Sequence, residues 1–389
     1  MSSQNPVFIP GPTNIPDSVR KACDMATIDH RSPTFAKLFK PAVAGVKRVL
    51  KMKDGEVIII PSTGTGGWEA AISNTLSAGD TVLAARFGMF SQRWIDMCQR
   101  HGLKVQIIET PWGQGAPLAA IEAALKADTK GEIKAVLATH NETATGVRSD
   151  IGGIRAAMDA AKHDALLMVD GVSSIGSMPF EMGAWGVDLA VAGSQKGFML
   201  PVGLCIVGVS PKALAAMDTA TLPRTFFDFR DMLKSYAAGG YPYTPAVGLI
   251  AGLAHSIELL EDEGMEIVYA RHHRLAEGVR RAIAAWGMKP CAVSPELYSE
   301  TVTAVVVPEG CNGTDLVKVA AEKYHMAFGV GLGEVAGKVF RIGHLGMLTD
   351  AMMLSGLAVA EMCMADLDWP VKLGSGVAAA QEYYRKTAA

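Results

Sequence analysis

Short apolar runs alternate with amphipathic stretches through the first two thirds of the chain. The apolar runs are rich in branched side chains and predict strands at residues 56–61, 81–85, 105–109, 135–139, 165–170 and 188–192. Helices are expected between them at residues 68–76, 92–101 and 150–163. Strands that are separated by helices pair in parallel, so we predict an α/β sandwich with a mostly parallel sheet. The run 205–209 follows a short connection and is a candidate for antiparallel pairing.

The pattern changes character after about residue 246. Helical periodicity alternates with shorter strand-like runs, with helices expected at 246–261, 265–286, 314–325 and 350–364 and strands at 301–308 and 340–342. This mixture predicts a smaller α+β domain. We therefore expect an N-terminal arm over residues 1–20, a large domain over 21–265 and a small C-terminal domain over 266–389. The last residues, 374–389, are small and polar and are expected to fray.

Composition narrows the classes of protein to consider. Of 389 residues, 49% are hydrophobic and 19% are charged, as in ordinary globular proteins. The 36 lysines and arginines are balanced by 39 aspartates and glutamates, which argues against a nucleic-acid partner. No apolar run reaches the roughly 18 residues of a membrane span, and the first residues lack the pattern of a secretion signal. A cytoplasmic protein without a membrane anchor is expected.

Cysteine and histidine spacing gives no indication of a metal site. The six cysteines are scattered without a CxxC pair, so we expect reduced core residues. His272 and His273 are adjacent in a helical pattern and would point in different directions. No metal is predicted.

A glycine-rich turn follows the first predicted strand. Residues 62–69 read Ser-Thr-Gly-Thr-Gly-Gly-Trp-Glu and lead into a predicted helix. A helix N-terminus offers free N–H groups and a positive dipole end to an anion, and Thr65 can add a hydroxyl. The turn is not a Walker loop, because no Lys-Ser or Lys-Thr follows the glycines. It is a candidate phosphate site, and a plain structural turn is the alternative.

Two charged residues follow buried strands farther along the chain. Asp170 ends the run 165–170, and Lys196 comes shortly after the run 188–192. A buried carboxylate needs a partner, and a lysine withdrawn from water has a lowered pKa and can form a Schiff base. Taken singly, Asp170 is compatible with a helix N-cap or a loop salt bridge, and Lys196 with a surface turn. Together with the glycine-rich turn they supply the phosphate site, the acid and the amine that pyridoxal phosphate (PLP) needs.

Several motifs in order resemble the class V, fold-type I PLP aminotransferases of the serine–glyoxylate, aspartate–glyoxylate and alanine–glyoxylate group. The motifs extend over essentially the whole chain, at residues 11–16, 29–31, 62–69, 140–146, 169–174, 193–197 and 340–343. The resemblance implies a large domain with a mostly parallel seven-stranded sheet between helices, a smaller α+β domain and PLP as cofactor. It also implies a homodimer with shared active sites.

The same resemblance implies roles around the cofactor ring. Lys196 would hold PLP as a Schiff base and move the substrate proton, while Asp170 would keep the pyridine nitrogen protonated. The ring would lie between Val172 and Phe90, and Thr143 would hydrogen-bond the ring hydroxyl. Phe90 as a plain core aromatic is the alternative.

Further residues would hold the phosphate and the substrate. The implied phosphate contacts are Thr65, Gly66 and Gln195 of one chain with Tyr241 and Thr244 of the neighbouring subunit. Arg341 would grip the substrate α-carboxylate with its guanidinium fork. His30 and Arg31 would lie at the substrate mouth or cap the following helix. A structural ion pair for Arg341 and an ordinary turn for residues 241–245 are the alternatives.

The expected reaction moves an amino group from a small L-amino acid to glyoxylate, giving glycine and a 2-oxo acid. Serine is slightly favoured over aspartate, because aspartate needs a second cation, for which Arg31 is the candidate. A lyase or desulfurase of the same fold is less favoured, because no cysteine matches a mobile substrate loop. A nucleotide-binding dehydrogenase is also less favoured, because the glycines at 64–66 and 329–333 do not form a strand–GxGxxG–helix unit.

Overall fold

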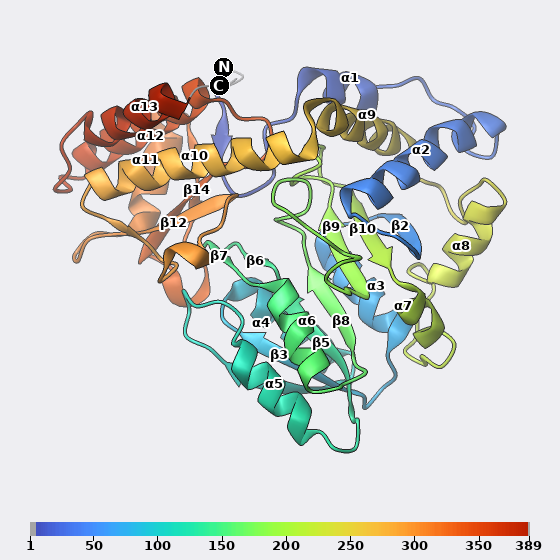
Figure 1. Ribbon diagram of the computed structural model, residues 1–389. Coiled ribbons are helices and arrows are strands. Elements are labelled where there is room, and N and C mark those ends of the chain that lie inside the picture. The colour runs from blue at the N-terminus through green and yellow to red at the C-terminus, as the bar shows by residue number, and fades with distance from the viewer. Residues whose placement is uncertain (1–4, 388–389) are drawn as a thin grey trace.

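The computed structural model describes residues 5–387, which form two layered units around two sheets (Figure 1). The larger sheet has seven strands in the order β2 (Glu56–Pro61), β10 (Leu204–Val209), β9 (Leu189–Gly193), β8 (Leu166–Asp170), β5 (Ile133–Thr139), β3 (Thr81–Arg86) and β4 (Lys104–Glu109). Strand β10 runs antiparallel to both β2 and β9, as its short connection suggested, and the remaining pairs are parallel. The expected mixed α/β sheet is therefore confirmed.

Helices cover both faces of this sheet. In Figure 1, α5 (Leu118–Ala127) and α6 (Ile151–Ala160) lie in front of it, and α3 (Gly64–Thr75) and α4 (Met89–Arg100) lie behind it. The remaining helices of this unit are α1 (Asp17–Cys23), α2 (Pro33–Val49), α7 (Pro211–Ala216), α8 (Phe229–Ala237) and α9 (Val247–Glu263). Parallel pairing brings the carboxyl ends of six strands to one edge, which is where ligand sites form in such sheets.

The second unit has its own sheet and core. Its strands lie in the order β1 (Val7–Phe8), β13 (Ala327–Val330), β14 (Val339–Gly343), β12 (Val302–Val306) and β11 (Lys289–Pro290). Its helices are α10 (Met265–Ala285), α11 (Gly313–Tyr324), α12 (Asp350–Asp366) and α13 (Ser375–Thr387), with short 3-10 turns at Pro295–Leu297 and Gly333–Val335. A two-stranded hairpin, β6 (Asn141–Glu142) with β7 (Val147–Arg148), completes the strands.

Strand β1, within the expected N-terminal arm, joins the small sheet. Strand β1 pairs in parallel with β13, and Phe8 is fully buried in the second core, stacked on Phe328. The chain then crosses to the large unit, where the Thr13 N–H donates to the carbonyl of Gln195 at 3.1 Å. The segment therefore links the small sheet to the turn that carries Lys196.

The expected fraying of residues 374–389 is wrong for the described part of that segment, up to residue 387. Helix α13 packs along α10, and the buried hydroxyl of Tyr384 donates to the carbonyl of Leu275 at 3.0 Å. The buried carboxylate of Glu361 accepts hydrogen bonds from the N–H groups of Gly376 and Val377 at the start of the helix. A negative charge at a helix N-terminus stabilises the helix, which explains the order in a stretch of small residues.

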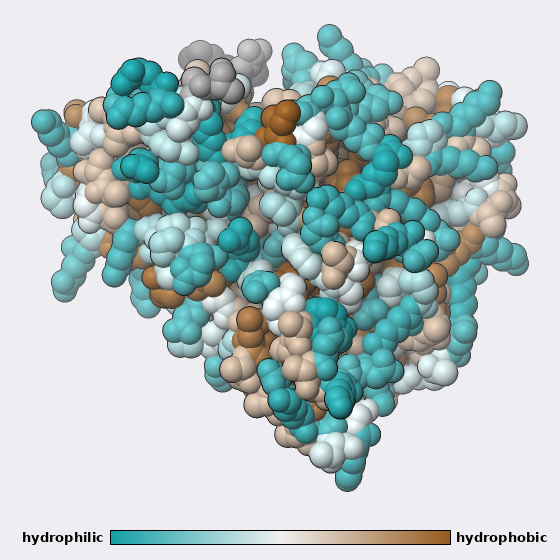
Figure 2. All heavy atoms as spheres, in the orientation of Figure 1, coloured by the Kyte–Doolittle hydropathy of each residue, from teal (hydrophilic) through white to brown (hydrophobic). Residues whose placement is uncertain are grey.

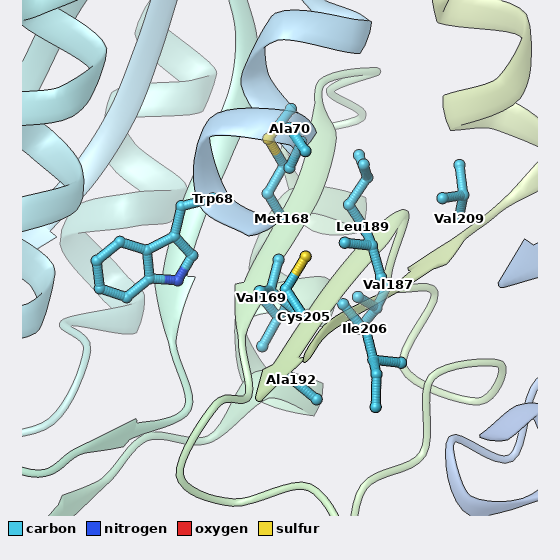
Figure 3. Close-up of a cluster of buried hydrophobic side chains, with 14 of the residues drawn as sticks. Trp68, Ala70, Met168, Val169, Val187, Leu189, Ala192, Cys205, Ile206 and Val209 are labelled. Carbon is cyan, nitrogen blue, oxygen red and sulfur yellow. The ribbon is translucent and has the colours of Figure 1, made fainter. Parts of the chain in front are cut away.

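The large core lies between the sheet and its helices. Figure 3 shows Trp68 of α3 beside Met168, Val169 and Cys205 of the sheet. Cys98, Cys205 and Cys363 are buried, and burial raises the pKa of each thiol to about 12. All six cysteines are free thiols, as expected, although three of them are only partly buried. The face shown in Figure 2 is largely hydrophilic, and no helix among residues 5–387 could span a membrane.

Candidate active site

The glycine-rich turn opens α3 directly after β2. Its N-cap residue, Thr63, makes no side-chain capping bond, so the first N–H groups of the helix stay available to an anion. A Cβ on Gly66 would lie 2.0 Å from the Ser62 hydroxyl, and one on Gly64 would lie 2.5 Å from a methyl group of Val172. Both glycines therefore allow a close approach that a side chain would block. Thr65 is exposed at this opening.

Asp170 ends β8 with its side chain only 5% exposed. Its carboxylate accepts a hydrogen bond from the Val172 N–H at 3.0 Å. Burial raises the pKa of Asp170 to about 7; the charge of Glu142 also raises it, and the charge of Lys196 lowers it. A carboxyl group in this condition gains stability when a cation approaches, and the protonated pyridine nitrogen of PLP is such a cation.

Lys196 lies in the turn after β9, and its amine donates to the carbonyl of Pro10. Burial, followed by the charge of Arg341, lowers the pKa of Lys196 to about 8, and Asp170 opposes this shift. The amine is therefore much closer to its nucleophilic neutral form than an ordinary lysine. A Cβ on Gly11, which has φ +115°, would lie 2.3 Å from the Lys196 nitrogen. Only glycine allows this approach.

The predicted ring contacts lie at the same sheet edge. Val172 packs beside Gly64 of the glycine-rich turn, which we call the phosphate cradle. Gln195 has a buried side-chain oxygen without a hydrogen-bond partner. Phe90 is half-buried in the first turn of α4, and the Arg93 guanidinium lies over its ring at 5.4 Å. The Thr143 hydroxyl is buried and bonds to Ser173 at 3.4 Å. The unpartnered oxygen of Gln195 is the kind of atom that a bound group can satisfy.

Arg341 reaches from the small sheet to the large domain. Its side chain is 7% exposed, Nε donates to the carbonyl of Val330 at 2.8 Å, and Nη1 donates to that of Thr143 at 2.9 Å. Burial lowers the pKa of Arg341 to about 10, so it stays charged at neutral pH. Among residues 5–387 no carboxylate forms an ion pair with it, which removes the alternative of a structural ion pair. A fixed and unpaired guanidinium suits an incoming carboxylate.

Four predicted residues make no hydrogen bond or ion pair with the other site residues within residues 5–387, and for Tyr241 and Thr244 the expected contact is with a neighbouring subunit. The Tyr241 hydroxyl donates to the carbonyl of Ile59 in its own chain at 2.7 Å, and its ring packs among core aromatics. The role of Tyr241 toward the phosphate of a neighbouring subunit stays a prediction. Thr244 is exposed, as is Arg31, and His30 is half-buried. The last two lie between α1 and α2 without capping the next helix, whose N-cap Ser32 makes no side-chain capping bond.

The sequence motifs did not identify Glu142 as a functional residue. It lies beside Thr143 and is completely buried, and its carboxylate accepts hydrogen bonds from the N–H groups of Phe90, Ser91 and Ala144. Its place in the motif at 140–146 was the only available signal, because two of these partners lie about 50 residues earlier in the chain.

The set as a whole fits PLP. An open helix N-terminus, a carboxyl group that lacks a cation and a lysine of lowered pKa match its phosphate, its ring nitrogen and its aldehyde. Phe90, Val172 and Thr143 follow the carboxyl ends of β3, β8 and β5 at the same sheet edge, and the Arg341 guanidinium reaches this edge through its bond to Thr143.

Comparison with known proteins agrees with this geometry. Residues 11–339 match the sequence profile of the class-V aminotransferases. The chain is 68% identical to L-aspartate–glyoxylate aminotransferase of Paracoccus denitrificans, covering 100% of this chain and 98% of that one. It is 54% identical to serine–glyoxylate aminotransferase of Hyphomicrobium methylovorum, covering 98% and 95%. The crystal structure of pyridoxamine–pyruvate aminotransferase from Mesorhizobium loti superposes with a TM-score of 0.92 at 29% identity, covering 100% and 99%.

Proposed function

The chain belongs to the class-V aminotransferases, PLP-dependent enzymes, and on that basis we propose that it transfers the amino group of L-aspartate to glyoxylate. The products would be oxaloacetate and glycine. The observation that carries the proposal is the 68% identity to an aspartate–glyoxylate enzyme, over 100% of this chain and 98% of that one. Identity to two serine–glyoxylate enzymes is 54% and 52%, so serine, which the sequence motifs slightly favoured, becomes the second candidate donor.

Each residue of the site has a defined task under this proposal. Lys196 would provide the amine for the cofactor aldehyde and would move the proton at the substrate Cα, as its lowered pKa favours. Asp170 stabilises positive charge on the ring nitrogen, and Arg341 orients the substrate α-carboxylate. Bound PLP supplies an electron sink for charge that develops at the Cα.

The α3 N-terminus would bind the cofactor phosphate. Thr65 and Gly66 would contribute N–H groups there, with the Thr65 hydroxyl and the side chain of Gln195 as further partners. Asp170 would hold the ring nitrogen, and Lys196 would supply the amine for the aldehyde. Val172 and Phe90 would then restrict the ring from its two faces.

Aspartate requires a cation for its second carboxylate, and we assign this task to Arg31 under the same proposal. Arg31 is exposed, and its backbone N–H donates to the Asp29 carboxylate at 2.9 Å, which shapes the loop that carries it. No charged partner of its guanidinium is found within residues 5–387. His30, next to it, would line the same mouth.

We also propose that the enzyme works as a homodimer. Val202 is 53% exposed and Phe226 is 42% exposed, and both are apolar residues next to the phosphate cradle. Gly203 accepts from the Ser62 N–H at 2.9 Å, and Phe227 lies 3.2 Å from the position of a Cβ on Gly66. A second copy would cover this apolar surface and bring exposed Thr244 within the shared region. Sedimentation of the PLP-loaded protein as a monomer that retains activity would contradict the proposal.

A half-reaction screen tests the donor. The purified protein is loaded with PLP, and the visible absorption of the cofactor is followed after addition of aspartate, serine or alanine at matched concentrations. We expect aspartate to convert the band fastest and glyoxylate to restore it. Faster conversion by serine would make serine the donor, and a protein that takes up no PLP would contradict the enzyme assignment.

A further inference from the structure

Glu142 occupies an unusual position for an acidic residue. It is completely buried in the two-residue strand β6, next to Thr143. Its carboxylate accepts hydrogen bonds from the N–H groups of Phe90 at 3.0 Å, Ser91 at 3.0 Å and Ala144 at 3.1 Å. Burial raises the pKa of Glu142, and the three hydrogen bonds oppose this rise, because all three partners are donors and suit an ionised carboxylate rather than a carboxylic acid.

The carboxylate acts as an external cap of α4. The N-cap residue of this helix is Gly88, which has no side chain to satisfy the first-turn N–H groups, and Glu142 satisfies those of Phe90 and Ser91. The positive end of the helix dipole favours a negative charge there. A Cβ on Gly88 would lie 2.2 Å from the Glu142 carboxyl carbon, so glycine leaves the space that the carboxylate occupies.

The first turn of α4 carries the aromatic ring predicted to stack on the cofactor. Glu142 holds the backbone of Phe90, while the guanidinium of Arg93 covers the Phe90 ring at 5.4 Å. On the other side of Glu142, the carbonyl of Thr143 accepts from Arg341 at 2.9 Å. One buried carboxylate therefore connects the segments that hold the ring face, the ring hydroxyl and the substrate carboxylate.

The charge of Glu142 also reaches the ionisable groups of the site. It raises the pKa of Asp170, and it is the one charge that raises the pKa of Arg341 against the effect of burial. The loss of this charge would lower the pKa of Asp170 and of Arg341. It would also lower the pKa of a protonated cofactor group bound between them.

We propose that Glu142 is a positioning residue, which places Phe90 against the cofactor ring and supplies a fixed negative charge behind the site. The proposal rests on the proposed function and deepens it, because it assigns a task toward the same cofactor. The capping of α4 by Glu142 involves only this chain's own residues, so it can be measured without the cofactor.

The experiment compares three variants with the wild type. Glu142→Gln removes the charge, and Gly88→Ala displaces the carboxylate while it keeps the charge. Glu361→Gln is the matched control, because Glu361 is a buried carboxylate that caps α13 in the same way but lies in the core of the small domain. Each protein is measured for thermal stability, for hydrogen exchange of residues 87–94 without cofactor, and for circular dichroism and pH titration of the visible band with PLP.

Glu142→Gln should speed exchange over residues 87–94, weaken the dichroism of bound PLP and move the titration midpoint of its visible band to lower pH. The value of kcat/KM should fall about 10- to 100-fold, as for other lost charge-assisted hydrogen bonds. Gly88→Ala should reproduce the changes in exchange and dichroism with a smaller shift of the midpoint. Glu361→Gln should lower stability without any of these three changes.

Two results would overturn the proposal. The first is that Glu142→Gln loses stability as Glu361→Gln does, with exchange over 87–94 and cofactor dichroism like those of the wild type. The second is that Gly88→Ala leaves exchange and dichroism unchanged. If the wild type took up no PLP, the proposed function would fail by that result, and the exchange measurement would still support or contradict the capping of α4.

Discussion

The amine of Lys196 donates a hydrogen bond to the carbonyl of Pro10, more than 180 residues earlier in the chain. The N-terminal segment, which begins in the small sheet, thus lies directly on the reactive side chain in the large domain. Next to Pro10, Gly11 leaves no room for a side chain beside the lysine. The lysine is therefore oriented by both domains.

Gly11→Ala should impair the lysine directly. The new methyl group would lie 2.3 Å from the Lys196 nitrogen, so the amine must move. Because a displacement of about 1 Å can cost about 100-fold in rate, kcat and the rate of PLP uptake should both fall strongly. Gly102→Ala is the control, since Gly102 also has positive φ but no atom within 4 Å of the added Cβ. Equal losses in both variants would mean that backbone strain, and not crowding of Lys196, is responsible.

Asp170→Asn should stabilise the cofactor-free protein, and it should abolish PLP binding. The raised pKa of about 7 means that the native state holds a proton that the unfolded state has already released above its ordinary pKa of 3.8. Stability of the wild type therefore falls as the pH rises from about 4 to 7 and stays low above pH 7. The gain in the variant should grow over the same interval, at no more than about 1.4 kcal/mol for each unit of pKa shift.

Thermal unfolding of the cofactor-free proteins between pH 4 and 8 checks this difference. Asp128→Asn provides a control of opposite sign, because hydrogen bonds to backbone N–H groups and to His163 hold the pKa of Asp128 at about 2, against the effect of its burial. That variant should be less stable than the wild type at pH 7. If the difference in stability between Asp170→Asn and the wild type did not change with pH, the raised pKa of the buried Asp170 carboxyl group would be contradicted.

Arg341→Lys should weaken the use of every α-amino acid to a similar degree. The lysine keeps the charge but loses the planar fork, whose Nε and Nη1 are fixed by carbonyl groups. We expect kcat/KM to fall about 10- to 100-fold for aspartate, serine and alanine alike. Steady-state kinetics with the three donors measures this loss. A loss confined to one donor would show that Arg341 binds the side chain of that donor rather than the α-carboxylate.

Arg31→Ala should discriminate between donors. If Arg31 binds the second carboxylate of aspartate, kcat/KM for aspartate should fall about tenfold more than that for serine. Arg20→Ala is a suitable control, because Arg20 is an exposed arginine nearby in the chain that pairs with Asp17 on α1. An equal effect of Arg31→Ala on both donors would place the second cation elsewhere.

Much of the site could be predicted because it depends on strand ends. The apolar runs before Asp170 and Lys196, and the glycines after β2, mark the carboxyl edge of a parallel sheet, and the structure brings all three to that edge. Their chemistry follows from burial, which the flanking apolar residues already indicate.

Long-range contacts account for what the sequence did not predict. No local pattern tells that Glu142 accepts from an N–H group of Phe90, or that Tyr241 bonds to Ile59. The small residues near the C-terminus suggested fraying, because their order depends on Glu361 in another helix. The pairing of β1 with β13 could not be predicted either, because a strand of two residues has no periodic pattern.

The pairing of β1 with β13 also determines when the small sheet can be completed during synthesis. Val7 pairs with Ala327, so the first strand has no partner until some 320 further residues have been made. The ribosome adds residues at about 5–20 per second, and domains generally fold from the N-terminus onward. The large sheet can therefore form while β1 is still unpaired, and the segment that contacts Lys196 is fixed to the small sheet only near the end of translation.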